Sequence, residues 1–217
     1  MQTFRLGLLL LALCAVGAVS MAAAPDVPAT PPSPSYADVP EMRALLHWEH
    51  FPLHIFFPAG RLASPERKGL VLAGFDEWVR ATHGIVCYQV VLTGSQADLS
   101  ITFTPHLPAA GSSHVGGQTT LTRTGTVLKK AAMEIAERDE DRAGFQAVCA
   151  HEFGHALGID GHSDDPDDIM FPVMSFSRPL VRNDEIDPPD PARSVTRRDL
   201  GTLQAAYPDT VFAPPKH

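Results

Sequence analysis

Two histidines four residues apart, with a glutamate directly after the first, are the residues in this sequence best suited to chemistry. They are His151, Glu152 and His155. On an α-helix, side chains four apart project from the same face, about 40° from each other, so both imidazoles can bind one metal ion. Glu152 lies about 100° further round, where its carboxylate can reach a water molecule at the ion without binding the ion itself. The pattern predicts metal-assisted hydrolysis with Glu152 as the general base.

The chain that follows His155 can supply a third ligand. Gly158 has no Cβ and can adopt a positive φ, which would turn the chain back toward the ion. His162 then offers a third neutral nitrogen. Three protein ligands with a fourth position open to water are the arrangement of a catalytic zinc ion. We therefore predict that His151, His155 and His162 bind Zn²⁺, which lowers the pKa of the water so that Glu152 can accept its proton.

The elements that must position these residues follow from apolar periodicity and from helix-end signals. Ser64 precedes a proline at the start of one helix, Gly158 ends a second, and Thr196 with Asp199 approximates a capping box for a third. The helices are expected over 65–82, 142–157 and 196–207. Alternating or β-branched runs predict strands over 54–57, 85–92, 97–103, 118–122 and 127–135. The last of these could also be helical from Leu128 onward.

The zinc-site segment resembles that of the metzincins, and within them most closely that of the matrixins, the family of the matrix metalloproteases. Residues 151–159 fit the zinc helix of that family, Ser163 follows the third histidine as in matrixins, and 169–172 is similar to the Met-turn. Further resemblances lie at 75–78, 97–101 and 196–207. The resemblance implies an α+β catalytic domain with a twisted mixed sheet of about five strands and three helices. It also places Met170 below the zinc as an apolar floor.

The sequence departs from the matrixin pattern in two places. Matrixins have their third histidine three residues after the glycine, whereas here Gly161 occupies that position and His162 comes one residue later. A flexible glycine in the turn can bulge and still deliver His162 to the metal, so we retain His162 as the ligand. The alternative ligand is Asp160, because some related enzymes use an aspartate. The second departure is that neither Cys87 nor Cys149 lies upstream of the domain, where a thiol could cap the zinc.

The first forty residues are expected to lie outside the catalytic domain. Residues 1–24 contain one cation, Arg5, an apolar run and small residues before a cleavage point, which is typical of a signal peptide. That run is too short for a membrane anchor. Residues 25–40 are rich in proline and are expected to form a linker. The peptidase domain then covers 41–217, and the protein should be secreted, either into a periplasm or outside the cell.

Charge and composition narrow the possible partners and cofactors. Removal of Arg5 from the 17 basic residues leaves 16 against 25 acidic residues, so a nucleic-acid surface is not expected. Acidic clusters at 137–141, 164–168 and 184–190 could be solvated loops or could bind Ca²⁺, but none has the spacing of a known calcium loop. Cys87 and Cys149 could form one disulfide or remain two buried thiols. His114 could contact substrate or a second metal, although an ordinary loop histidine is the simpler interpretation.

If the matrixin plan applies, the strand around 118–122 borders the substrate site, and an extended peptide pairs with it through main-chain hydrogen bonds. Val148 and residues 172–174 would line a pocket for an apolar side chain.

Two alternatives come from other classes of protein. A thermolysin-like peptidase would need a distant glutamate ligand, for which Glu185 is the candidate downstream. A zinc-binding extracellular protein without turnover would have no need for a base at Glu152.

Overall fold

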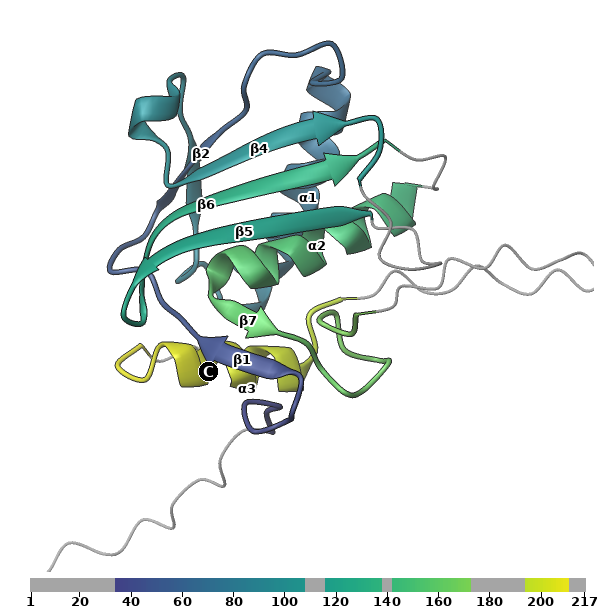
Figure 1. Ribbon diagram of the computed structural model, residues 1–217. Helices are drawn as coiled ribbons and strands as arrows, with labels where there is room; N and C mark the ends of the chain where they lie inside the picture. Colours follow the sequence, from purple (N-terminus) through teal and green to yellow (C-terminus); the bar gives the residue numbers. More distant parts are fainter. Residues whose placement is uncertain (1–33, 108–115, 138–141, 173–193, 211–217) are drawn as a thin grey trace, which may run out of the picture. The chain divides into compact units, whose positions relative to one another are not determined.

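The computed structural model describes residues 34–107, 116–137, 142–172 and 194–210 of the chain (Figure 1). One five-stranded sheet and three α-helices make up most of this part. The strands of the sheet are ordered β3-β2-β4-β6-β5. They are β2 (Leu53–Phe56), β3 (Tyr88–Val90), β4 (Leu99–Thr104), β5 (Gly117–Thr124) and β6 (Val127–Ala136).

The sheet is mixed, as expected. The pairs β2–β3, β2–β4 and β4–β6 are parallel, whereas β5 runs antiparallel to β6 and forms one edge. Residues 127–136 are therefore a strand, and the helical alternative from Leu128 is wrong. Alternate residues of β6, among them Met133 and Ile135, are fully buried, because successive side chains of a strand point to opposite faces.

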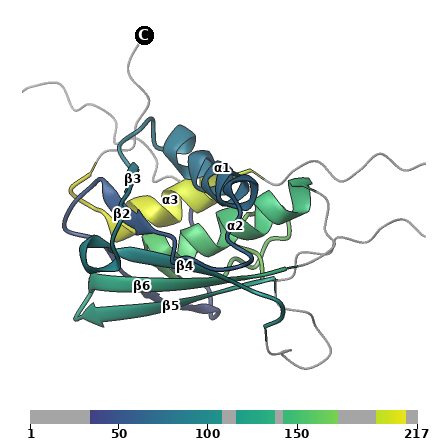
Figure 2. The same cartoon turned by 90° about the horizontal axis from the view of Figure 1, so that it is seen from above.

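Helices α1 (Pro65–Ala81) and α2 (Arg142–Leu157) lie on the same face of the sheet (Figure 2). Ser64 caps α1 by accepting a hydrogen bond from the backbone N–H of Arg67 at 3.2 Å. The two helices cross at Gly74, where a Cβ atom would lie 2.7 Å from Cβ of Cys149. Cys149 is thus part of the helix interface, and it is not joined to Cys87 by a disulfide. The disulfide alternative is therefore wrong, and of the two thiols expected to be buried, Cys149 is buried and Cys87 is half-buried.

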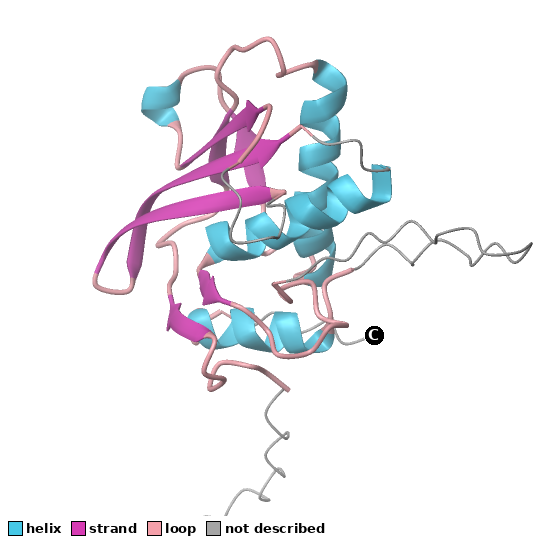
Figure 3. Cartoon of the chain, turned by 45° about the vertical axis from the view of Figure 1, so that its right-hand side comes forward, coloured by secondary structure: helices cyan, strands magenta, loops and turns pink. Residues whose placement is uncertain are grey.

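A second layer, which the sequence predicted only in part, lies beside the C-terminal end of α2 (Figure 3). It contains α3 (Arg197–Ala206) and a two-stranded antiparallel sheet of β1 (Met42–Leu45) and β7 (Ile159–Gly161). The expected capping box at the start of α3 is confirmed, with Thr196 and Asp199 bonded reciprocally. A short 3-10 helix, Gly94–Gln96, precedes β4.

Residues before Glu41 already pack into the domain, so the linker expected over 25–40 does not extend as far as Glu41. Tyr36 is only 1% exposed and packs in the main hydrophobic core. Its hydroxyl donates to Oδ1 of Asp199 at 2.7 Å, and its backbone N–H donates to Oγ1 of Thr202 at 3.0 Å. The proline-rich composition of 25–40 concealed this single aromatic anchor.

The assignments of 1–24 to a signal peptide and of 25–33 to a linker lie outside the described residues. Among the described helices, none is long and apolar enough to cross a membrane.

Loss of the Tyr36 hydroxyl should destabilise the fold. We expect Tyr36→Phe to lower the free energy of unfolding by about 1–3 kcal/mol, because a buried carboxylate loses a hydrogen-bond donor. Denaturant unfolding with an unchanged slope would measure this loss. Tyr88→Phe is a matched control, since the Tyr88 hydroxyl donates to Asp76 at 3.0 Å in a more accessible position. Equal effects of the two substitutions would contradict the anchoring role of Tyr36.

Candidate metal centre

The helix that carries His151, Glu152 and His155 is held at three of its backbone carbonyls by aromatic side chains. Trp78 Nε1 donates to the carbonyl of Ala150 at 2.8 Å, and Trp48 Nε1 donates to that of Ala156 at 2.8 Å. The hydroxyl of Tyr207 donates to the carbonyl of Leu157 at 2.7 Å. Ala156 and Leu157 are the last residues of α2, where backbone carbonyls have no N–H partner inside the helix, so the last two bonds supply the missing donors. They fix the end of α2 nearest the two histidines.

The two helix histidines have their tautomers set by the backbone. Nδ1 of His151 lies 2.8 Å from the carbonyl oxygen of Ile169, and Nδ1 of His155 lies 2.8 Å from that of Ile159. Because a carbonyl can only accept, each Nδ1 must carry the proton. Nε2 of each neutral ring is then an acceptor, and the two Nε2 atoms face each other at 3.2 Å. This is the orientation that metal-binding histidines adopt when their other nitrogen donates to a carbonyl.

His162 completes a cluster of three imidazoles. The centroids of the rings are 4.8 Å apart for His151 and His155, 5.3 Å for His151 and His162, and 5.0 Å for His155 and His162. One nitrogen from each ring lies within 4.8 Å of the others. Zinc–nitrogen bonds of about 2.0–2.1 Å at tetrahedral angles separate two ligand atoms by about 3.3 Å. The spacing of the Nε2 atoms of His151 and His155 agrees with that value, so the residues fit a zinc ion.

Burial favours the neutral form of His155 and His162. Desolvation lowers the pKa of His155 well below its usual value, and the neighbouring His151 adds to the effect. Desolvation also lowers the pKa of His162, with a contribution from the charge of Arg43. A neutral imidazole is the form that binds a metal, so the lowered pKa values of these two rings favour metal binding.

A strand pairing brings His162 to the other two rings. Gly158 has a φ of 117°, and a Cβ there would lie 2.0 Å from the carbonyl oxygen of Leu46. The chain then runs as β7 along β1, and Gly161 is so close that a Cβ would meet the carbonyl oxygen of Glu41 at 2.6 Å. The extra glycine therefore does not bulge, contrary to our expectation. The register shifts in β1 instead, between Met42 and Ala44.

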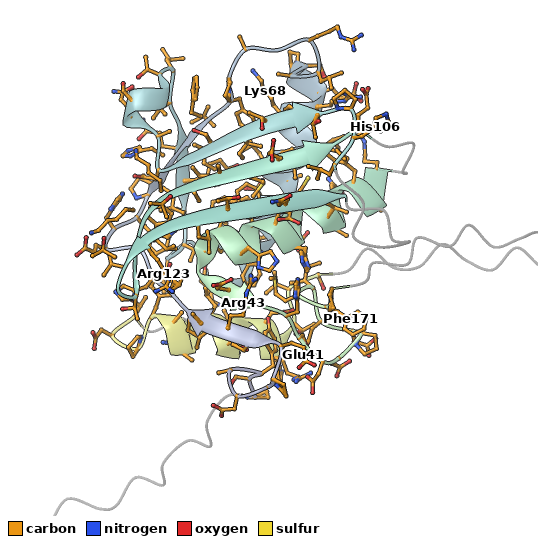
Figure 4. The ribbon with its side chains drawn as sticks, viewed as in Figure 1. Glu41, Arg43, Lys68, His106, Arg123 and Phe171 are labelled. Atoms are coloured by element: carbon orange, nitrogen blue, oxygen red, sulfur yellow. The ribbon has the colours of Figure 1, made fainter. Side chains whose placement is uncertain are left out.

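The rival ligand, Asp160, is engaged elsewhere. Its Oδ1 forms an ion pair with Nη2 of Arg43. Arg43 lies on β1 (Figure 4), between the two residues where the register shifts. Asp160 is absent from the group of side chains around His151 that could hold an ion. The geometry therefore favours His162 over Asp160 as the third ligand.

Glu152 is buried between α2 and the edge strand β5. Its side chain approaches Gly117 so closely that a Cβ on Gly117 would lie 2.4 Å from Cγ of Glu152. Oγ1 of Thr119 donates to Oε2 of Glu152 at 2.7 Å, and the carbonyl oxygen of Glu152 lies 3.2 Å from the same hydroxyl. Burial raises the pKa of the Glu152 carboxyl to about 7, while the hydrogen bond from Thr119 acts in the opposite direction. Sequence reasoning had not singled out Thr119, because nothing in a run of threonines marks which one faces α2.

Met170 packs against α2 at Gly154, which has no side chain and so leaves room for the Met170 side chain. The Met170 side chain is fully buried, and its Sδ occupies the space that a Cβ on Gly154 would need. The backbone N–H of Ser163 donates to the carbonyl of Met170 at 3.0 Å, which ties the segment after His162 to this turn. The assignment of 169–172 as a Met-turn below the zinc stays a prediction. Of the expected pocket wall, Val148 is buried in α2, whereas 173–174 lie outside the described residues.

The acidic cluster at 164–168 has a structural role. Arg198 forms ion pairs with Asp164, Asp165 and Asp168. Asp168 is only 2% exposed and also accepts a hydrogen bond from Oγ1 of Thr196. The solvated-loop interpretation is therefore wrong for Asp168, and nothing here supports Ca²⁺. The cluster at 184–190, most of that at 137–141, Glu185 and His114 lie outside the described residues.

A second set of metal-ligating side chains was missed by the sequence analysis. His50, His54 and Asp98 also bring one ligand atom each to within 4.8 Å of one another. The two histidines are four apart but are not on a helix, and Asp98 reaches them only through the pairing of β2 with the segment that enters β4. No spacing in the sequence signals that contact.

Three helices, a mixed five-stranded sheet and the histidine cluster are consistent with a metzincin-like α+β fold. Comparison with known proteins assigns the family: the Matrixin model (Peptidase_M10) matches residues 54–190, more than half of the chain, and the chain belongs to this family. Over 40 residues it is also 50% identical to matrix metalloproteinase-9 of the dog, Canis lupus familiaris. That match covers 18% of this chain and only 6% of the relative.

The two candidates for the third ligand can be separated by metal content. We expect His162→Ala to lower the affinity for Zn²⁺ by at least about tenfold, because the site loses one of three protein ligands. Asp160→Ala, which removes a neighbouring carboxylate and leaves the three rings in place, should retain zinc. Elemental analysis after dialysis against buffered zinc measures both. The reverse order of affinities would assign the ligand to Asp160.

Proposed function

We propose that this protein is an exported zinc-dependent endopeptidase. The observation that carries the proposal is the convergence of His151, His155 and His162, with Glu152 buried beside them. Membership of the matrixin family supports it, because this family consists of zinc metallopeptidases. Export rests on the signal-peptide pattern of residues 1–24. N-terminal sequencing of protein recovered from outside the cytoplasm would test export separately from activity.

The three imidazoles would hold the ion through their ring nitrogens. When bound, Zn²⁺ supplies Lewis acidity, which activates water and polarises a peptide carbonyl. The protein supplies rigidity: the carbonyls of Ile159 and Ile169 hold the rings of His155 and His151 by hydrogen bonds of 2.8 Å each. Ligands held in this way do not have to be ordered when the metal binds.

Glu152 would act as the general base and later as the proton donor to the leaving amine. Burial raises the pKa of the Glu152 carboxyl, which favours the uptake of a proton from a water molecule, as general base catalysis requires. The Thr119 hydroxyl holds one carboxylate oxygen at 2.7 Å. This contact restricts the rotation of the carboxylate, so we assign Thr119 as a positioning residue.

The edge of β5 would bind the substrate. In the described sheet β5 pairs with β6 on one side only, which leaves main-chain groups along its other side for an extended peptide. Thr119, which donates a hydrogen bond to Glu152, belongs to β5. A peptide paired with β5 would therefore lie close to the proposed general base. The substrate class that fits is therefore an extended segment of a polypeptide.

The alternative function is a zinc-binding extracellular protein without turnover. Replacement of the base decides between the two. We expect Glu152→Gln to lower the hydrolysis of a quenched-fluorescent peptide library by about 10²–10⁴-fold, because general acid–base catalysis is lost. The three zinc ligands are unchanged, so bound zinc should be retained. A wild-type protein that cuts no peptide would favour the alternative, and loss of zinc in the variant would contradict the role of Glu152.

Metal removal provides the matching control. Chelation should abolish the hydrolysis by the wild-type protein, and addition of Zn²⁺ should restore it, whereas zinc should not rescue Glu152→Gln. Hydrolysis that survives complete removal of the metal would contradict the proposed mechanism.

The role of Thr119 can be tested with two substitutions of similar size. Thr119→Val keeps a β-branched side chain in β5 but removes the donor, and we expect kcat to fall on the order of tenfold with little change in KM. Thr119→Ser restores the hydroxyl and should recover most of kcat. An unchanged kcat in Thr119→Val together with a loss in Thr119→Ser would mean that the methyl group matters through packing and that the hydrogen bond to Glu152 does not.

A further inference from the structure

A second cluster of metal-ligating side chains lies where the first loop of the domain meets the beginning of β4. It consists of His50 in the loop before β2, His54 on β2, and Asp98 immediately before β4. None of these residues belongs to α2, to β5 or to the segment of β7 and His162, which carry the site described above. We propose that His50, His54 and Asp98 form a second, weaker zinc site.

Asp98 is held firmly enough to act as the central ligand. Its Oδ2 accepts a hydrogen bond from the backbone N–H of His54 at 2.8 Å, and its own backbone N–H donates to the carbonyl of His54 at 2.8 Å. The carbonyl of Asp98 accepts from the backbone N–H of Ala131 on β6 at 2.9 Å. The Asp98 side chain is only 13% exposed. The carboxylate is therefore preorganised by the sheet and does not have to be ordered by an ion.

Both imidazoles converge on the same carboxylate oxygen. Nε2 of His50 lies 3.1 Å from Oδ2 of Asp98, and Nδ1 of His54 lies 3.2 Å from it. Zinc bonds of about 2.0–2.2 Å to nitrogen and oxygen place two ligands in one coordination shell about 3.3 Å apart. Each imidazole is thus at a suitable distance from the carboxylate to share an ion with it. Two imidazoles and one carboxylate are a donor set for zinc, whereas Ca²⁺ and Mg²⁺ prefer oxygen ligands alone.

The geometry also makes this site weaker than the cluster of His151, His155 and His162. The ring centroids of His50 and His54 are 6.2 Å apart, wider than the 4.8–5.3 Å of the other three rings. The His50 side chain is 51% exposed, so it can rotate toward an ion, but that rotation has to be fixed on binding. Water would complete the coordination. The bound ion would fasten the loop that contains His50 to the sheet.

Zinc binding by the full chain tests the proposal. The protein is stripped with a chelator and dialysed at neutral pH against a series of buffered free Zn²⁺ concentrations. We expect two binding steps in the wild type, and His50→Ala should weaken the second step by at least about tenfold while it leaves the first unchanged. His83→Asn is the matched control. His83 is also exposed, its φ of 53° suits asparagine, and both steps should persist.

The outcomes separate this site from the proposed peptidase. A single binding step in the wild type, or two unchanged steps in His50→Ala, would show that the cluster is only an ion pair between histidine and aspartate. If His50→Ala folds poorly, the substitution His54→Gln serves the same comparison. Peptide hydrolysis at zinc concentrations that fill only the first step should be the same in the wild type and in His50→Ala. Absence of hydrolysis in both would overturn the proposed function without affecting the result on the second site.

Discussion

The hydrogen bonds from Nδ1 of His151 and His155 to backbone carbonyls are the interaction on which the metal centre depends. They decide which nitrogen of each ring faces the other, and at 2.8 Å each they leave little freedom of rotation. Both acceptors, the carbonyls of Ile169 and Ile159, belong to the chain that follows α2. The helix alone therefore does not make the site, although it carries two of the three histidines. The site exists only when the chain after α2 has returned and packed against it.

That returning chain is held by elements from both ends of the described structure. Asp199 on α3 accepts a hydrogen bond from the backbone N–H of Ile169 at 3.0 Å, and the same carboxylate accepts one from the hydroxyl of Tyr36. Ile169 in turn provides the acceptor for His151. Burial raises the pKa of Asp199 and Tyr36 alike, so an unpaired carboxylate in this position would be costly. A continuous series of hydrogen bonds thus connects the N-terminal segment, α3 and His151.

The helices and the strands of the main sheet could be predicted because each has a local signal. Periodicity and caps marked α1, α2 and α3, and alternation marked β4 to β6. The pair of β1 and β7 has no comparable signal. The two strands have only four and three residues, and they are more than a hundred residues apart in the sequence. Burial of Tyr36 and the meeting of His50 with Asp98 are long-range contacts of the same kind. The cluster of His151, His155 and His162 could be predicted in part, because the geometry of an α-helix places the first two on one face. The contact of Thr119 with Glu152 could not, because it depends on which residues of β5 face α2.

The extra residue before His162 shows how such a long-range contact resolves what spacing leaves open. Successive side chains of a strand point to opposite faces of the sheet. One inserted residue therefore turns every later side chain to the other face, unless the pairing register with the neighbouring strand shifts as well. Here the partner strand adapts, because β1 skips one residue between Met42 and Ala44, as in a β-bulge. The skipped residue is Arg43, and its guanidinium binds Asp160. The same irregularity therefore keeps β7 in the register that brings His162 to His151 and His155, and it pairs the carboxylate of Asp160 with the guanidinium of Arg43.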